Sequence, residues 1–332
     1  MNHRMPMSVV VVVILIACVS LWVAPAATQT AVPRTPWGDP DISGIFTTDA
    51  ETLVPFERPD EFGERRLLTE EELANRAGRA DARVRDDKEE RSGAGALLGT
   101  PAHWFEVGNV GDGVSARTSF VVDPADGRMP ALTTEAAEMP YDPRVETGLM
   151  TGEQPELLGP EDTGLASRCL TRGIPQTWVP SIYNNGFQIA QTPDYVLIWY
   201  ERYQEVRLIP LDGRPHLDPR IRQWKGDSRG RWDGDSLVID VTNFSDKARF
   251  KGSGETLHVV ERLTRVDADT LNVAVTIEDD TRWTRPWAFE VNGKRDPSYI
   301  VFEFACHEAN YTLKHMLSGS RALEKRAENS AR

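Results

Sequence analysis

Positive charge is scarce in this chain of 332 residues, which has 38 lysines and arginines against 51 aspartates and glutamates. The formal net charge is −13, and no dense group of basic residues interrupts the acidic background. Proteins that bind nucleic acids or anionic membranes need a basic patch to neutralise phosphates. The composition therefore argues against both classes and is that of an ordinary globular protein, with 40% hydrophobic residues.

The sequence also lacks the common motifs of nucleotide chemistry. It contains no G-x-G-x-x-G and no P-loop. These absences exclude the Rossmann and kinase interpretations, which depend on a glycine-rich loop at the phosphates. Gly226-Asp227-Ser228-Arg229-Gly230 has the G-x-S-x-G spacing, but no long helix is predicted after it, whereas the α/β-hydrolase nucleophile lies on a strand-to-helix turn. The H-x-H and H-E-x-x-H spacings are missing as well. We therefore predict no cofactor and no metal site.

Long apolar runs are missing too, apart from one at the N-terminus. Arg4 precedes a nearly unbroken apolar run from Val9 to Val23, and Ala24-Pro25-Ala26 offers a small-residue cleavage site. This pattern predicts a signal peptide over residues 1–27, and hence a periplasmic or secreted protein with no membrane span after cleavage. Lipid attachment at Cys18 is the alternative, which the apolar residues after that cysteine disfavour.

Cysteine is rare, with three in the whole chain. Removal of the signal peptide takes Cys18 and leaves Cys169 and Cys306. Two cysteines in an oxidising compartment most simply form one disulfide bond. A nucleophilic thiol is the competing interpretation, but neither cysteine lies in a recognisable nucleophile motif.

The rest of the chain divides into parts of different composition. Residues 28–166 are rich in proline, glycine and charge, and they predict a loop-rich wrap with one helix at about 70–91, begun by a capping box at Thr69-Glu70-Glu71-Glu72. Residues 167–312 predict an antiparallel β core, and residues 313–332 a C-terminal helix or tail.

Short strands separated by turn residues dominate the second half. The predicted strands are Ser181–Ala190, Tyr195–Tyr200, Glu205–Pro210, Ser236–Thr242, Leu257–Arg265, Thr270–Glu278, Thr284–Val291 and Tyr299–Cys306, with a further short strand at Ser119–Val122. Turn signals such as Asn292-Gly293 separate them. About eight strands without long helices between them predict a mainly-β fold, either an antiparallel barrel of lipocalin-like or calycin-like type or a β-sandwich.

Several motifs resemble those of a large family of exported, functionally uncharacterised bacterial proteins. They are Pro36-Trp37-Gly38-Asp39-Pro40-Asp41, Val122-Asp123-Pro124-Ala125-Asp126-Gly127-Arg128, Ile209-Pro210-Leu211-Asp212-Gly213-Arg214-Pro215-His216, Gly226-Asp227-Ser228-Arg229-Gly230-Arg231-Trp232, Leu257-His258-Val259-Val260-Glu261-Arg262 and Cys306-His307-Glu308. The resemblance covers nearly the whole mature chain. It implies export, but it implies no activity and no functional residues.

The strands between 236 and 278 predict a polar site. Keeping the apolar faces of neighbouring strands together pairs Val241 with Leu257, which sets Asp240 opposite His258. A three-residue loop at 267–269 then sets His258 opposite Glu278. One imidazole is thus expected between two carboxylates, with Arg262 on the same face.

This arrangement supports three interpretations. In a cavity, the carboxylates would raise the pKa of His258 and make it an acid or base near neutral pH, with Arg262 holding an anionic group. On an outer sheet face, the same residues would form an ordinary surface charge cluster. A divalent metal site is the third, which no ligand spacing supports. His216, in a proline-flanked loop, is interpreted as a structural hydrogen-bonding residue.

Aromatic residues concentrate in the β core, and four are candidates for ligand binding: Tyr183, Tyr203, Trp232 and Trp287. Two functions follow. The first is an exported, cofactor-independent acid–base enzyme (a lyase, isomerase or hydrolase) acting on a small aromatic or sugar-like substrate with His258, Asp240, Glu278 and Arg262. The second is a non-catalytic small-ligand-binding or scaffolding barrel. A small molecule is the implied partner, and the oligomeric state is not predicted.

Overall fold

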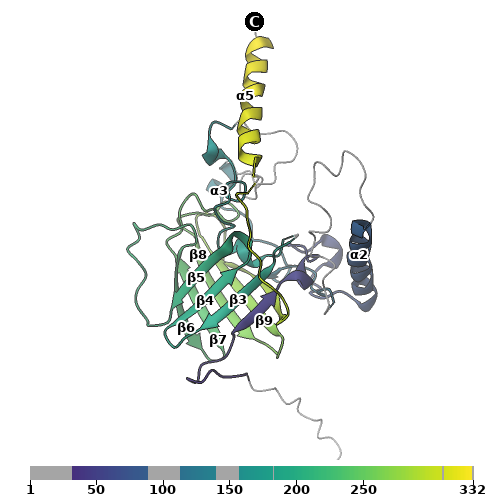
Figure 1. Cartoon of the computed structure of the whole chain (residues 1–332), viewed down its shortest axis with the longest axis vertical. Coiled ribbons are helices and arrows are strands. Elements are labelled where there is room, and N and C mark those ends of the chain that lie inside the picture. Colours follow the sequence, from purple (N-terminus) through teal and green to yellow (C-terminus); the bar gives the residue numbers. More distant parts are fainter. Residues whose placement is uncertain (1–31, 89–112, 140–156, 182, 309, 331–332) are drawn as a thin grey trace, which may run out of the picture. The chain divides into compact units, whose positions relative to one another are not determined.

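A computed structural model describes residues 32–88, 113–139, 157–181, 183–308 and 310–330. Its main element is a sheet of ten antiparallel strands, which curves around a common interior and nearly closes into a barrel (Figure 1). The strands are β1 (Gly44–Thr47), β2 (Val121–Asp123), β3 (Gly186–Gln191), β4 (Tyr195–Tyr200), β5 (Glu205–Pro210), β6 (Asp227–Asp233), β7 (Ser236–Thr242), β8 (His258–Arg265), β9 (Thr270–Glu278) and β10 (Trp287–Arg295). The mainly-β prediction is confirmed.

The strand order is β5-β4-β3-β1-β10-β9-β8-β7-β6, and β2 pairs with β10 outside this path. Side chains connect the two end strands: Arg207 of β5 donates to the Ser228 hydroxyl of β6 at 3.0 Å, and Lys225, just before β6, donates to the Val206 carbonyl of β5 at 2.8 Å. Gly230 allows this approach, because a Cβ there would lie 2.8 Å from Ile209 Cγ2.

One predicted strand was wrong, and two observed strands were not predicted. β1 and β6 were not predicted, because β1 is short and β6 contains little besides polar and glycine residues. Residues 299–306 are not a strand: Ile300 and Phe302 are exposed, so their apolar character does not mark a buried face. The predicted turn at Asn292-Gly293 lies inside β10, where a Cβ on Gly293 would lie 2.7 Å from Phe187 Cζ.

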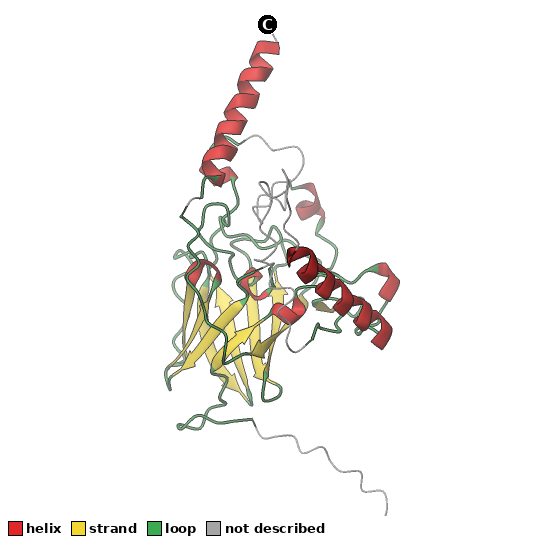
Figure 2. Cartoon of the chain, turned by 45° about the vertical axis from the view of Figure 1, so that its right-hand side comes forward, coloured by secondary structure: helices red, strands yellow, loops and turns green. Residues whose placement is uncertain are grey.

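Helices lie outside the sheet in Figure 2. They are α2 (Glu70–Lys88), α3 (Thr134–Glu138) and α5 (Thr312–Ser330), with 3-10 turns η1 (Asp49–Glu51), η2 (Asp60–Phe62), η6 (Pro160–Asp162), η7 (Gln176–Trp178) and η8 (Arg202–Gln204). The predicted capping box begins α2: the Thr69 N–H donates to Glu72 at 2.8 Å, and the Glu72 N–H donates to Thr69 at 3.3 Å. The expected end of this helix near residue 91 lies outside the described residues.

None of the helices in the described ranges is long and apolar enough to span a membrane. The predicted signal peptide at residues 1–27 lies outside these ranges.

Alternation along the strands directs one set of side chains into the barrel. This core is continuous and includes Phe46, Ile198, Ile239, Val259, Val275, Trp287 and Phe289. The interior also holds a buried ion pair, in which Arg207 Nη2 lies 2.8 Å from Glu261 Oε2. Trp178 donates to Glu261 at 2.7 Å, so this carboxylate interacts with both an indole N–H and a guanidinium group.

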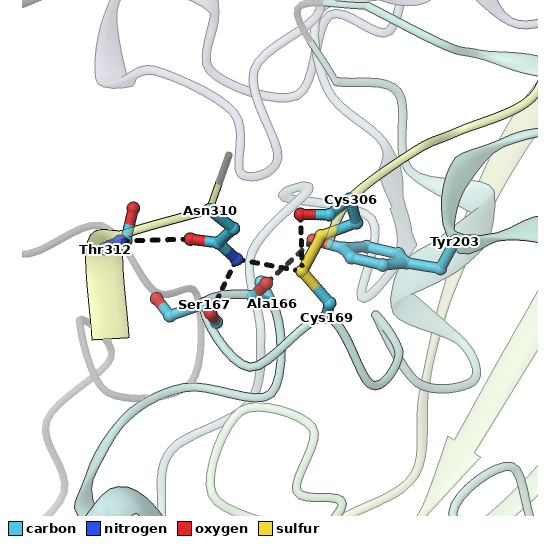
Figure 3. The surroundings of a disulfide bond; sticks show 7 residues. All are labelled: Ala166, Ser167, Cys169, Tyr203, Cys306, Asn310 and Thr312. Carbon is cyan, nitrogen blue, oxygen red and sulfur yellow. Dashed lines mark hydrogen bonds between the residues drawn. A yellow bond between two sulfur atoms is a disulfide. The ribbon is translucent and has the colours of Figure 1, made fainter. Parts of the chain in front are cut away.

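The predicted disulfide between Cys169 and Cys306 is present, with 5.7 Å between the Cα atoms. It joins two stretches that are 137 residues apart and that lie outside the strands. Figure 3 shows Asn310 beside it, where the side-chain amide lies 2.9 Å from Cys169 Sγ and 3.3 Å from the Ser167 carbonyl. The bond therefore fastens the segment that precedes α5 to the start of the β core.

Candidate functional site

The register of two hairpins positions the predicted polar site. Between β8 and β9, His258 pairs with Glu278, as predicted from the short loop between them. Between β7 and β8, Val241 pairs with Val259 and Asp240 with Val260, so the predicted pairing of Asp240 with His258 is wrong by two residues. A shift of two keeps each side chain on the same face, so Asp240 remains a diagonal neighbour of His258.

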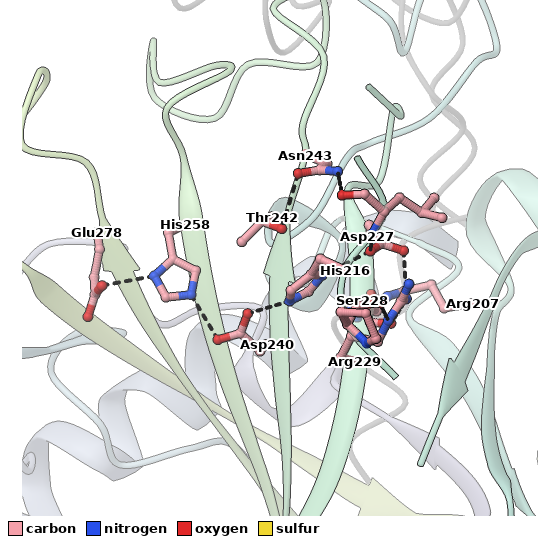
Figure 4. Close-up of polar contacts among 12 residues, drawn as sticks. Arg207, His216, Asp227, Ser228, Arg229, Asp240, Thr242, Asn243, His258 and Glu278 are labelled. Atoms are coloured by element: carbon pink, nitrogen blue, oxygen red, sulfur yellow. Dashed lines mark hydrogen bonds and ion pairs between the residues drawn. The ribbon is translucent and has the colours of Figure 1, made fainter. Parts of the chain in front are cut away.

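Five side chains join into one hydrogen-bonded row, which we call the carboxylate–imidazole chain (Figure 4). His258 Nδ1 lies 2.9 Å from Glu278, and its Nε2 lies 2.9 Å from Asp240. The other oxygen of Asp240 lies 2.7 Å from His216 Nε2, and His216 Nδ1 lies 2.9 Å from Asp227. The row crosses β6, β7, β8 and β9 and includes one residue from the loop between β5 and β6.

The number of carboxylate oxygens that face each imidazole ring can be compared with the number of N–H groups that the ring carries. A neutral imidazole has one N–H, whereas a carboxylate only accepts hydrogen bonds. Each ring faces carboxylate oxygens with both nitrogens, at 2.7 to 2.9 Å. His258, whose two nitrogens face Glu278 and Asp240, therefore satisfies both contacts only as an imidazolium ion.

Two of the groups have pKa values that agree with this picture. Burial alone lowers the pKa of His258, but hydrogen bonds and charges from Asp240 and Glu278 outweigh it and raise the pKa above 6.5. Burial raises the pKa of Asp240, but its bonds to His258 and His216 outweigh that effect and bring the pKa below 3.8. Each ion thus stabilises the other.

The carboxylate–imidazole chain lies on the outer face of the barrel. His258 and Asp240 point away from the core residues Val259 and Val241, and their side chains are 33% and 34% exposed. Asp227, at the other end, is buried and also accepts a hydrogen bond from Arg229 at 2.6 Å. Water reaches one end of the row, and the site is not enclosed by the barrel.

The remaining predicted residues lie elsewhere. Arg262 donates to Asp233 at 2.6 Å, in a half-exposed pair. Tyr183 and Tyr203 flank the guanidinium of Arg202 at 4.8 and 5.8 Å. Trp287 is fully buried in the barrel core, and Trp232 packs against the core from β6. The four aromatic side chains therefore do not line a common pocket.

His216 and Asp227 were not predicted as site residues. Both belong to motifs noted in the sequence, at 209–216 and 226–232, but no local pattern predicts where the intervening loop lies. The Asp227 carboxylate accepts the Leu217 N–H at 2.9 Å, which holds this loop beside β6. Contacts between distant segments, rather than periodicity, complete the row.

A cavity of about 570 Å³ lies on the outer side of β10. Its walls come from η1, from the segments around 58–67 and 113–122, and from the outward residues of β10. We call it the arginine-lined cavity; its charged residues are Glu51, Arg58, Arg66, Arg117, Glu290 and Lys294. No sequence pattern pointed to it, because the residues of its walls converge from four separate stretches.

Within the described ranges, no group of three or more His, Cys, Asp or Glu side chains is arranged to hold a metal ion. The carboxylates and imidazoles of the carboxylate–imidazole chain alternate along a row and do not converge on a point. Neither a scan against models of known protein families nor a search of curated proteins finds a match to the chain.

Proposed function

We propose that this chain is an exported, non-catalytic binding protein for a small organic anion, held in the arginine-lined cavity. The observation that carries the proposal is the concentration of four cationic side chains around one cavity in a protein of net charge −13. Two carboxylates share the walls, so the lining is net positive. A cavity of about 570 Å³ lies within the range of roughly 300 to 1,000 Å³ typical of small-molecule sites.

The cationic side chains differ in how many hydrogen bonds and ion pairs they make within the protein. Arg117 bonds to Glu290 at 2.9 Å and to Asn292 at 3.3 Å, so it forms part of the wall. Arg66 donates to the Val122 carbonyl at 2.9 Å and makes no ion pair with any described residue. Lys294 donates to the Thr270 hydroxyl at 2.7 Å. Arg66 and Lys294 therefore retain N–H groups that suit a carboxylate or phosphate.

Repulsion between cations supports the same conclusion. Burial lowers the pKa of Arg58, and the charge of Arg66 lowers it further, against the opposite effect of Asp126 and Glu64. Two guanidinium groups close enough to repel each other gain stability from an anion placed near both. A bound acid would supply that charge.

Calorimetry with cyclohexanecarboxylate and glucuronate tests the proposal. We expect wild type to bind at least one acid with a stoichiometry of one, and Arg66→Gln to weaken binding about tenfold or more, since a charge-assisted hydrogen bond is lost. Arg220→Gln is the matched control, because Arg220 is an exposed arginine that pairs with Asp218. The proposal is overturned if neither acid binds, or if Arg66→Gln binds as tightly as wild type.

The acid–base enzyme is the second candidate, favoured by the raised pKa of His258. Both of its ring nitrogens are engaged, so a reaction requires Glu278, the most exposed member of the row, to release Nδ1 while Asp240 keeps Nε2. The imidazole would then exchange protons with a small aromatic or sugar-like substrate, as a lyase, isomerase or hydrolase. The carboxylate–imidazole chain lies on the open outer face of the barrel and no cavity among the described residues encloses it, which favours the binding function over the enzyme.

Incubation with a panel of aromatic and glycosidic compounds, followed by mass spectrometry, separates the two candidates. A new product mass supports the enzyme, and His258→Ala should then reduce its formation on the order of 10²- to 10⁴-fold. Arg262→Gln is the comparison variant, since Arg262 bonds to Asp233 and not to the row. Full turnover by His258→Ala would exclude His258 as the acid or base.

A further inference from the structure

One carboxylate in the arginine-lined cavity, that of Glu51, is almost fully buried, although Ser115 and the Asn292 backbone contribute hydrogen bonds to it. The Glu51 side chain is only 2% exposed, and its Oε1 lies 3.7 Å from Arg117 Nε. Its other oxygen, Oε2, is buried and has no hydrogen-bond partner among the described residues. A buried carboxylate oxygen left without a donor costs free energy, which a donor from a ligand would recover.

We propose that Glu51 selects ligands that carry a hydroxyl group, so that the cavity takes a hydroxylated organic acid, such as a sugar acid, in preference to a plain one. The inference rests on the proposed binding function and adds a second requirement to the anionic group, namely a hydroxyl group on the ligand. The anionic group meets Arg66 and Lys294, and a hydroxyl donates to Glu51 Oε2.

The surrounding charges favour a neutral donor over an ammonium group. Arg117 lies against Glu51, and Arg76 is also near enough to lower the pKa of its carboxyl. Arg76 is buried and is held by the carbonyls of Ser115 and Arg117 at 2.6 and 2.7 Å. A further cation at this place would meet two guanidinium groups, whereas a hydroxyl adds a hydrogen bond without adding charge.

Burial also bears on the state of Glu51 itself. Desolvation raises the pKa of its carboxyl, while Arg117, Ser115, the Asn292 backbone and Arg76 act in the opposite direction. A hydroxyl that donates to Oε2 stabilises the ionised form and so opposes the desolvation. Binding of a hydroxylated acid and ionisation of Glu51 therefore support each other.

Three probes of similar size separate the contributions. Glucuronate has a carboxylate and hydroxyls around the ring, cyclohexanecarboxylate has the carboxylate alone, and glucose has the hydroxyls alone. With the full purified chain, calorimetry should show that glucuronate binds at least about tenfold more tightly than cyclohexanecarboxylate. Glucose should bind most weakly of the three. The ratio of the two acid affinities is the readout, because it cancels any change in the general attraction for anions.

Two variants of Glu51 test the assignment. Glu51→Met removes the acceptor with little change in volume, and it should bring the affinity ratio close to one. Glu51→Gln keeps a carbonyl acceptor without the charge, so it should give an intermediate affinity ratio. This second variant also tests the assignment if Glu51→Met does not fold. Glu255→Gln is the matched control, because Glu255 lies outside the cavity, is half-exposed and is near Arg222; its ratio should stay at the wild-type value.

The outcomes keep the two proposals apart. If both acids bind wild type equally, or if both Glu51 variants keep the wild-type ratio, the selection by Glu51 is wrong and the binding function stands. If neither acid binds wild type, the binding function itself is wrong. A ratio that falls only in the Glu51 variants supports both.

Discussion

Two charged networks lie on opposite sides of strand β8, and burial gives them different properties. Glu261 points into the barrel, where its side chain is 0% exposed and its partner Arg207 is 3% exposed. His258 points outward, where it and Asp240 are each about one-third exposed. The interior pair is held away from water, so each of its two groups depends on the other for compensation of its charge. The outer row reaches water and exchanges protons with it, so its charges depend on pH.

The interior network also bridges the gap in the barrel. Arg207 comes from β5 and donates to Ser228 of β6, the two strands at the ends of the sheet. The same guanidinium donates to Glu261 at 3.1 Å and to the Tyr200 hydroxyl at 3.2 Å. One buried charge pair thus connects the two end strands to β8 through the interior.

Removing one partner of the interior pair should have the largest effect. Glu261→Gln leaves Arg207 buried without a counter-charge, and breaking such a pair costs about 3 to 5 kcal/mol of unfolding free energy. Urea denaturation followed by tryptophan fluorescence measures this loss. The double variant Glu261→Leu with Arg207→Met is the control, since replacing both charges by apolar groups should recover most of the stability. A loss below about 1 kcal/mol for Glu261→Gln would contradict the stabilising role assigned to this pair.

Breaking the outer row at its centre should have a smaller effect that varies with pH. Asp240 is the carboxylate shared by both imidazoles, so Asp240→Asn removes the negative charge between them and replaces one of the two acceptor oxygens by an NH2 group. Because water screens these groups, we expect a loss of about 1 kcal/mol near pH 5.5. Urea denaturation at several pH values measures it, and Arg262→Gln, on the same outer face, should show no such pH dependence.

The sign of this dependence follows from the shifts. The pKa of His258 is raised, so its contribution is complete below its unfolded value of 6.5 and is lost as the pH rises through the folded value. The pKa of Asp240 is lowered, so its contribution is complete above 3.8 and is lost as the pH falls through the folded value. Both contributions are present near pH 5.5. The difference between wild type and Asp240→Asn should therefore shrink toward pH 9, and an equal difference at both pH values would contradict this account.

The two sides of β8 also differ in how far the sequence could predict them. Alternation of apolar residues predicted which side chains of β7, β8 and β9 share a face. The short loop at 267–269 was enough to pair His258 with Glu278 correctly. The longer connection at 243–257 carries no turn geometry that sets a register, so the pairing of β7 with β8 was wrong by two residues.

What the sequence could not predict depends on long-range contacts. His216 reaches the row from a loop that is held by contacts with distant residues, among them its own bonds to Asp227 and Asp240 and the bond from Asn243 to the Leu217 carbonyl. β6 shows no apolar alternation, because its inward positions face β5 across the gap in the barrel. At Gly230 there is no room for a side chain, since a Cβ there would lie 2.8 Å from Ile209 Cγ2. The arginine-lined cavity likewise forms from separate stretches. Local patterns predicted the sheet and the two carboxylates of His258, but not the parts that come from elsewhere in the chain.

The smallest effect is expected at the exposed end of the row. Glu278 is 45% exposed and bonds to one ring nitrogen of His258, so Glu278→Gln leaves the bridge through Asp240 intact. We expect a change in unfolding free energy of about 0.5 kcal/mol or less, since exposed ion pairs contribute little. The clearer signal is the pKa of His258, measured by NMR titration of the ring protons: it should fall in Glu278→Gln, because one of the two carboxylates that raise it is neutralised. It should fall further in Asp240→Asn, because Asp240 contributes more to the shift than Glu278. An unchanged pKa of His258 in both variants would show that the row does not hold its imidazolium, and the contrast between the two sides of β8 would then rest on the interior pair alone.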